Sequence, residues 1–175
     1  MLLHDARRAA CFDGCELVLL ADQGRSLWNA EQIAAGRARL DRALALRGRG
    51  PYVVQAAIAS LHADEPPDWP QIAALYAELA RLSDSPVVEL NRAITVAEAD
   101  GPAAGLAIVD GLALDGFHYL HATRGDLLDR LGRAGEARCL RSRARARPRR
   151  RRAPPARAAH REARRGSQSV IAIRS

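Results

Sequence analysis

Apolar positions in the middle of the chain recur with the spacing of a helix. Between residues 69 and 82 the apolar side chains at i, i+3, i+4 and i+7 are Ile72, Leu75, Tyr76 and Leu79. This spacing places them on one face of an α-helix. Asp68 comes just before as a helix-capping residue, with Gln71 three positions later, as in a capping box. The pattern predicts an amphipathic helix that begins after Asp68.

Segments of the same kind, bounded by capping and turn residues, follow one another along most of the chain. They predict further helices at residues 2–10, 30–46, 51–63, 86–100, 103–112, 118–131 and from 134 onward. Residues 52–63 are almost wholly apolar, so we expect that helix to be buried on most sides. Residues 11–24 should be irregular. Strand-type alternation is absent, so the predicted fold class is all-α, with seven or eight helices and no sheet.

One stretch of sequence echoes another at a fixed offset. Residues 97–109 (AEADGPAAGLAIV) and residues 128–140 (LDRLGRAGEARCL) align 31 positions apart, as counted from Gly101 to Gly132. Both read as a helix, a glycine-containing turn and a second helix rich in small residues. The echo favours a TPR-like array of antiparallel helix pairs, an architecture that leaves a concave face available for a partner.

The positive charge of the chain is confined to its C-terminal part. Of the formal net charge of +7, residues 139–175 contribute 13 Arg and one acid (+12), and residues 1–138 contribute 14 Arg and 19 acids (−5). We therefore divide the chain into a helical domain, residues 1–138, and an Arg-rich tail, residues 139–175. Because like charges repel, we expect a disordered tail, and the end of the apolar period after Leu140 suggests a frameshift near Cys139. The alternative is a basic arm that contacts nucleic acid non-specifically or an anionic membrane.

No residue pattern in the chain is typical of a catalytic, cofactor or metal site. Cys11, Cys15 and Cys139 form no CxxC pair, and His4 is the nearest further ligand to the first two. A GxSxG nucleophile and a glycine-rich phosphate loop are both missing. The sequence has no run of about 18 apolar residues and no secretory leader. We expect a cytoplasmic, non-enzymatic protein with no catalytic, cofactor or metal residues and no membrane partner.

A small set of polar and aromatic residues stands out as candidates for contact with a partner. They are Asp22, Gln23, Arg25, Trp28, Asp68, Trp69, Asn91 and Arg92. One interpretation is that they line a concave binding face. The alternative, which we favour for Asn91 and Arg92, is an internal hydrogen-bond network that joins successive helices. For Trp69 the favoured alternative is a place in the core.

Four blocks of sequence carry a resemblance to a known family. They are GPYVVQAAIASLH (50–62), DWPQIAALYAEL (68–79), PVVELNRA (86–93) and YLHATRGDLLDRLGRAGEA (119–137). In this order they resemble the C-terminal TPR-like helical domain of one group of bacterial extracytoplasmic-function sigma factors. Residues 22–29, DQGRSLWN, are similar to a family segment close to DQDRSRWD, with departures at Gly24, Leu27 and Asn29. The resemblance covers about residues 1–138.

The resemblance implies a regulatory domain that acts in transcription initiation. Its expected partners are the RNA polymerase core or the N-terminal domains of a sigma factor. The promoter-reading and polymerase-binding portions of such factors are missing from the sequence, so we expect a truncated form without its own promoter recognition. A stand-alone TPR-like peptide-binding scaffold is the alternative. A third function, an enzyme, would need a clustered pair of titratable residues in a pocket.

Overall fold

Helices make up most of the computed structural model, which describes residues 2–13, 16–18, 20–114 and 117–146. In chain order they are α1 (Leu2–Asp5), α2 (Ala30–Ala45), α3 (Pro51–Leu61), α4 (Trp69–Leu82), α5 (Pro86–Asp100), α6 (Pro102–Asp110), α7 (His118–Arg130) and α8 (Ala134–Ala146). Three 3-10 turns also lie in the N-terminal part: η1 (Arg8–Ala10), η2 (Leu20–Asp22) and η3 (Arg25–Leu27). The all-α prediction is confirmed.

The helices begin where the sequence supplies caps. Asn29 Oδ1 accepts a hydrogen bond from the backbone N–H of Gln32 (2.9 Å), and α2 starts at the next residue. Asp68 Oδ1 does the same for the N–H of Gln71 (3.0 Å) at the start of α4. Each bond satisfies one of the backbone donors that a helix N-terminus leaves without an intrahelical partner. These starts follow from local sequence alone.

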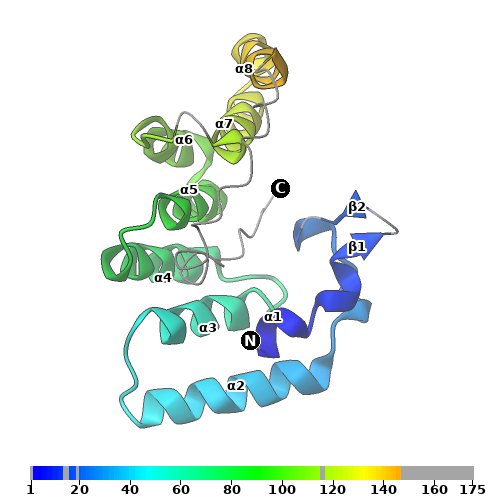
Figure 1. The fold of residues 1–175 in the computed structure, drawn as a ribbon, viewed down its shortest axis with the longest axis vertical. Helices are drawn as coiled ribbons and strands as arrows, with labels where there is room; N and C mark the ends of the chain where they lie inside the picture. Colours follow the sequence, from blue (N-terminus) through cyan, green and yellow to red (C-terminus); the bar gives the residue numbers. More distant parts are fainter. Residues whose placement is uncertain (1, 14–15, 19, 115–116, 147–175) are drawn as a thin grey trace, which may run out of the picture.

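The helices form a stack in which each one packs against the next along the chain (Figure 1). Helix α2 lies at one end of the stack and α8 at the other. The described residues of the N-terminal segment, 2–13, 16–18 and 20–28, begin at the α2 end, where α1 contacts both α2 and α3. This segment brings residues from the start of the chain against the end of α3.

Helix α5 is the most deeply buried helix, and α3 is less buried than its sequence predicts. Seven residues of α5 are buried, whereas in α3 only Ile58 and Ala59 are, and Tyr52 is 84% exposed. The expectation that residues 52–63 would be buried on most sides is wrong. Helix α3 lies next to the end of the stack, and only Gly36 is buried in its outer neighbour α2. An apolar composition raises the tendency to be buried, but the place in the stack sets how many neighbours a helix has.

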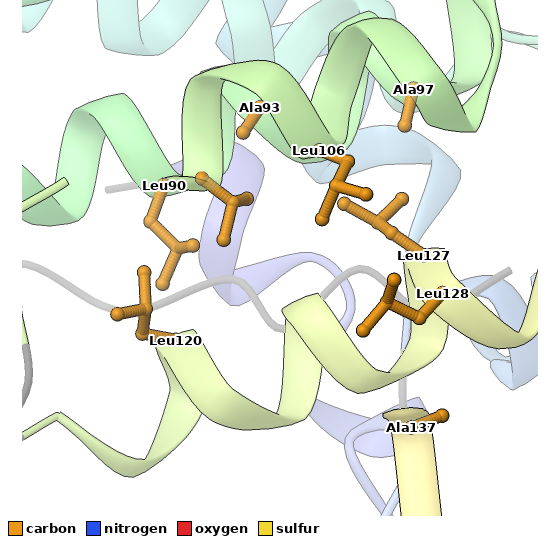
Figure 2. Close-up of a cluster of buried hydrophobic side chains, with 9 residues drawn as sticks. Leu90, Ala93, Ala97, Leu106, Leu120, Leu127, Leu128 and Ala137 are labelled. Carbon is orange, nitrogen blue, oxygen red and sulfur yellow. The ribbon is translucent and has the colours of Figure 1, made fainter. Parts of the chain in front are cut away.

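The core divides into one large cluster and two smaller ones. The large cluster joins α5, α6, α7 and α8 and includes Leu90, Leu106, Leu127 and Leu128 (Figure 2). A second cluster joins α3, α4 and α5 through residues such as Ile72 and Tyr76. A third consists of Leu20 and Ile94, with Trp28 and Trp69 packed against them, and ties the N-terminal segment to the stack.

The sequence echo corresponds to equivalent positions in two helix pairs. Gly101, between α5 and α6, and Gly132, between α7 and α8, both have positive φ, at 96° and 74°. Glycine enters this region without the steric cost that a Cβ atom brings. The residue pairs at the same offset, Ala97 with Leu128 and Leu106 with Ala137, are buried in the large cluster.

The segment 11–24, expected to be irregular, contains a two-residue antiparallel pair, β1 (Phe12–Asp13) and β2 (Glu16–Leu17), with Phe12 opposite Leu17. At the other end α8 continues to Ala146, and the rest of the Arg-rich tail, residues 147–175, lies outside the described residues. Among the described helices, none has the length and apolar character needed to cross a membrane.

Candidate functional site

Residues of the N-terminal segment, the C-terminal end of α3 and helix α4 meet at one place, which we call the junction. It consists of His4, Arg7, Arg25, Trp28, His62, Trp69 and Tyr76. Of the candidates from the sequence, Arg25, Trp28 and Trp69 belong to it. Trp28 and Trp69 come together because both pack against Leu20 and Ile94.

Arg25 fixes the N-terminal segment to the C-terminal end of α3. Its Nη1 donates a hydrogen bond to the carbonyl oxygen of His62 (2.7 Å), 37 residues away in the chain. His62 caps α3, and the last carbonyls of a helix have no intrahelical donor and carry the negative end of the helix dipole. The Arg25 guanidinium also lies over the ring of Trp28, 4.2 Å from its centroid, as in a cation–π contact.

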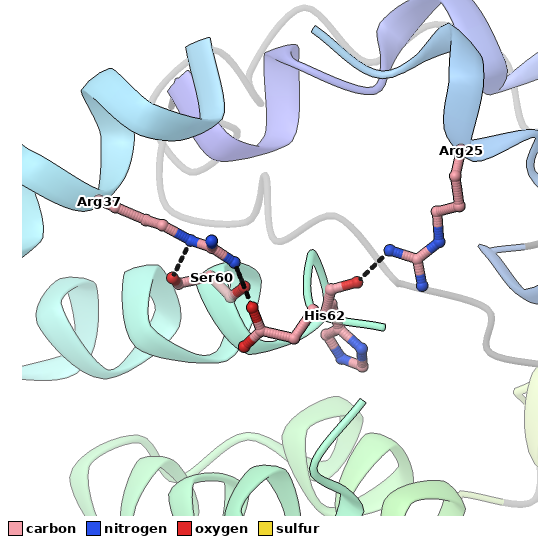
Figure 3. A network of polar contacts seen from close by, with 5 residues as sticks. Arg25, Arg37, Ser60 and His62 are labelled. Carbon is pink, nitrogen blue, oxygen red and sulfur yellow. Dashed lines mark hydrogen bonds and ion pairs between the residues drawn. The ribbon is translucent and has the colours of Figure 1, made fainter. Parts of the chain in front are cut away.

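A second arginine, Arg37, also binds the C-terminal end of α3 and lies near Arg25 (Figure 3). We call these two contacts the arginine clamps. The charge of Arg37 is neutralised by a carboxylate. Arg37 of α2 donates to the hydroxyl and the carbonyl of Ser60 (both 3.1 Å) and pairs with the carboxylate of Asp64 at 2.5 Å. Arg25 has the corresponding carbonyl contact with α3 but no carboxylate among the described side chains within ion-pair distance. The two clamps therefore differ in net charge.

His62 is buried at the centre of the junction. Its side chain is 3% exposed, and its ring meets the edge of Trp69 with the centroids 5.8 Å apart. Burial lowers the pKa of His62 to about 4, and the positive charges of Arg7 and Arg25 act in the same direction. The imidazole is therefore neutral near pH 7.

Arg7 and His4 add positive and polar groups on the N-terminal side. Arg7 Nη2 lies 3.4 Å from His4 Nδ1, and the Arg7 carbonyl accepts a hydrogen bond from Cys11 Sγ at 3.3 Å. Burial lowers the pKa of both Arg7 and His4, and the Arg25 charge further lowers the pKa of Arg7. Burial also raises the pKa of the Tyr76 hydroxyl, so this group stays neutral. The junction holds two guanidinium charges in partly buried surroundings.

Several polar atoms at or next to the junction are buried without a hydrogen-bond partner in the described structure. They are Trp28 Nε1, His62 Nε2 and Gln23 Oε1. Gln23 uses its amide N–H to donate to the carbonyl of Val18 (3.2 Å). Buried polar groups in folded proteins are nearly always hydrogen-bonded, so each unsatisfied one needs an explanation.

The other candidate residues lie away from the junction or act within their own helix. Asp22 is exposed at the end of η2, and Asp68 is occupied as the cap of α4. Arg92 Nε donates to Glu89 Oε2 at 2.9 Å, one turn earlier in α5. This pair lies within one helix, so for Arg92 the expected link between successive helices is wrong. Asn91 is buried in α5.

Sequence reasoning missed three residues of the junction: His4, Arg7 and His62 in its central role. Arg7 follows Ala6 on a short segment whose buried residues are Leu3, Ala6 and Ala10. An arginine next to such an apolar face indicates that its side chain is partly buried. The sequence pattern does not show its neighbours at the junction, because they come from a different part of the chain. No group of three or more His, Cys, Asp or Glu is placed to hold a metal ion in the part of the chain that the structure describes.

Acidification should destabilise the fold through His62. Its pKa is about 4 in the folded protein and 6.5 as an unperturbed side chain, so below pH 6.5 the unfolded state binds a proton that the folded state does not. The contribution of neutral His62 to the free energy of unfolding is fully present above about pH 6.5, and it is lost as the pH falls towards 4. Between about pH 7.5 and pH 5 we expect a loss of about 2 kcal/mol in the free energy of unfolding, measured by urea denaturation.

The matched variants are His62→Phe, which keeps a ring against Trp69, and His121→Gln on α7. The first should remove most of the loss on acidification, and the second should retain it. An unchanged pH dependence in His62→Phe would show that other groups cause it.

Comparison with known proteins adds little information on function. A family described as a family of unknown function (DUF6596) matches residues 1–44. An uncharacterized protein of Rhizobium meliloti (strain 1021) is 48% identical to the chain over 145 residues, which cover 79% of this chain and 34% of that protein. The chain thus spans about a third of the length of this relative. No solved structure matches the chain. Residues 1–44 include His4, Arg7, Arg25 and Trp28, whereas His62, Trp69 and Tyr76 lie beyond them.

Proposed function

We propose that the chain is a regulatory, protein-interaction domain of an extracytoplasmic-function sigma factor. In this role it acts in transcription initiation through contacts with the RNA polymerase core or with the N-terminal sigma domains. It does not select a promoter by itself. Nucleic acid binds only non-specifically, through the Arg-rich tail.

The observation that carries the proposal is the meeting of separate family-like motifs at the junction. Arg25 and Trp28 come from the DQGRSLWN segment, His62 ends the GPYVVQAAIASLH block and Trp69 begins the DWPQIAALYAEL block. Residues that are far apart in the sequence and belong to one family pattern have a common structural role here. This supports the proposal that the chain shares its fold with the sigma-factor domain that it resembles, and that both present the segment equivalent to Asp22–Trp28 to a partner.

A surface suited to protein contact is also present. Leu44, Leu46 and Tyr52 are exposed where α2 ends and α3 begins. The charge of residues 1–138, −5, gives this part of the molecule no electrostatic basis for binding nucleic acid. Both features favour a protein partner over DNA.

Binding to immobilised full-length chain tests the proposal. The two analytes are core RNA polymerase and the part of the Rhizobium meliloti relative that lies outside the matched region. We expect one of them to bind and Asp22→Ala to weaken binding by about tenfold, as loss of a charged contact at an interface does. Asp41→Ala, which removes an exposed carboxylate from α2, should leave binding unchanged.

Two outcomes would contradict the proposal. Binding of neither analyte would favour the stand-alone scaffold. Promoter-selective, salt-tolerant DNA binding in a gel shift would favour a DNA-reading protein, because binding through the tail must fall steeply with salt.

A further inference from the structure

Two arginines of the junction differ from the other arginines with described side chains. Seven arginines form ion pairs: Arg8, Arg37, Arg81, Arg92, Arg124, Arg130 and Arg133. Five others are solvent-exposed: Arg39, Arg42, Arg47, Arg49 and Arg138. Arg7 and Arg25 are partly buried, and no carboxylate among the described side chains pairs with either. The fold thus places two positive charges where solvent screens them poorly, and the described side chains supply no counter-charge.

Unsatisfied polar atoms accompany these charges. Arg25 contacts both Trp28, through its ring, and His62, through its carbonyl. Both of these residues carry a buried ring nitrogen, Trp28 Nε1 and His62 Nε2, that has no partner among the described residues. The indole N–H can only donate, and a neutral imidazole can donate from Nε2. Arg7 lies 3.4 Å from His4 Nδ1, and after burial its charge is the next cause that lowers the pKa of His62.

We propose that the junction is a binding site for a carboxylate, held by Arg7 and Arg25 with the Trp28 and His62 ring nitrogens as further donors. A planar guanidinium binds a carboxylate with two parallel hydrogen bonds. One carboxylate brings the negative charge that the described side chains of the junction lack, and it accepts hydrogen bonds from the two donors that they leave unsatisfied. Gln23 Oε1 is an acceptor and takes no part in binding the carboxylate. The site goes beyond the proposed function, because it rests on the junction alone.

The carboxylate has two possible sources that share this chemistry. It can belong to a small organic acid or to a Glu or Asp side chain of a polypeptide. The two tryptophans of the chain, Trp28 and Trp69, both lie at the junction, so the indole signals report on the site directly. The probes are succinate, a short peptide with two Glu residues and its Gln counterpart, with inorganic phosphate for comparison. All are titrated into the ¹⁵N-labelled full chain at constant ionic strength.

The expected result is a saturable shift of the Trp28 indole N–H resonance with succinate or with the Glu peptide. Saturation with succinate identifies a small acid as a sufficient ligand. Saturation with the Glu peptide alone, and not with the Gln peptide, identifies a side chain. Arg7→Gln and Arg25→Gln should each weaken the binding about tenfold or more, as loss of a charge-assisted hydrogen bond does. Arg25→Lys, which retains the charge, should weaken it less, and Arg81→Gln on the surface of α4 should have no effect.

Far-UV circular dichroism of each variant separates loss of binding from loss of fold. If Arg25→Gln unfolds the N-terminal segment, Arg7→Gln and Arg25→Lys still test the site. The proposal is overturned if no carboxylate probe shifts Trp28, if phosphate binds as well as the carboxylates, or if the folded arginine variants bind like the unaltered chain. None of these outcomes depends on polymerase binding, so failure of the site and failure of the proposed function are distinguishable.

Discussion

Leu90→Ala is expected to lower the free energy of unfolding by about 3–4 kcal/mol, which is a large part of the stability of a domain of this size. Leu90 is 1% exposed and belongs to the cluster that joins α5 to α6, α7 and α8 (Figure 2). Truncation removes buried methyl groups and leaves a cavity whose walls are held by several helices, so the site cannot collapse fully. Urea denaturation followed by the helical circular dichroism signal measures the loss.

The matched control is Leu82→Ala at the end of α4. Leu82 makes the same substitution possible at a position that is 44% exposed. There we expect a change below about 1 kcal/mol, because nearly half of the Leu82 surface already faces water and its truncation leaves no closed cavity. Equal losses at positions 82 and 90 would mean that α5 is not the centre of the core.

Gly105→Ala is expected to destabilise the protein by about 3 kcal/mol because α5 and α6 approach closely at this residue. An added Cβ would lie 2.6 Å from the carbonyl oxygen of Ala93 and 2.6 Å from the Cβ of Ala97. One of these atoms belongs to the backbone, so the clash cannot be relieved by a rotamer change. The helices would have to move apart and loosen the contacts of Leu106. Thermal and urea denaturation both measure this effect.

Gly135→Ala provides the control for helix propensity. Gly135 lies in the first turn of α8, and apart from its chain neighbours and the backbone of its own helix no heavy atom of the described residues lies within 4 Å of the position that a Cβ would take. Alanine there should leave stability unchanged or raise it by up to about 1 kcal/mol, since glycine is a poor helix former. A loss at position 135 as large as that at position 105 would show that glycine is needed at both for a reason other than close helix packing.

Local structure was largely predictable because its causes are local. The starts of α2 and α4 depend on Asn29 and Asp68, whose side chains bond to N–H groups three residues later. The extent of α5 depends on Pro86 at its start and Gly101 after its end. Each of these signals acts within one or two turns of helix, so it can be read from a short window of sequence.

How deeply each helix is buried in the stack could not be predicted from short windows of sequence. Residues 52–63 have the composition of a central helix, yet α3 lies beside the poorly buried α2 and Tyr52 faces solvent. The burial of a helix in this stack depends on how many helices lie on each side of it. That number is set by the whole chain and not by the sequence of the helix itself. Helix α5 is central because helices stack on both of its faces, although its sequence includes the polar residues Asn91 and Thr95 at buried positions.

The candidate site was predictable only in part. Arg25, Trp28 and Trp69 came from the residues that stood out in the sequence, and the junction contains all three. Arg7, His4 and His62 were missed because their roles depend on contacts between the start of the chain and the end of α3. The Arg25–His62 bond spans 37 residues, and no periodic pattern within a helix encodes such a contact.

The position of the N-terminal segment has a consequence for the order in which the molecule assembles. From α3 to α8 the main contacts join helices that are neighbours in the chain, so these contacts form at a small cost in loop-closure entropy. The Arg25–His62 bond instead closes a long loop, and the core cluster beside it is small, with Leu20 and Ile94 as its buried residues. The helical stack should therefore form first and the N-terminal segment should dock onto it later, as contacts of high sequence separation do. In the native state the same segment should detach from the stack at a lower free energy than that of global unfolding, and its detachment should leave the helices from α3 to α8 folded.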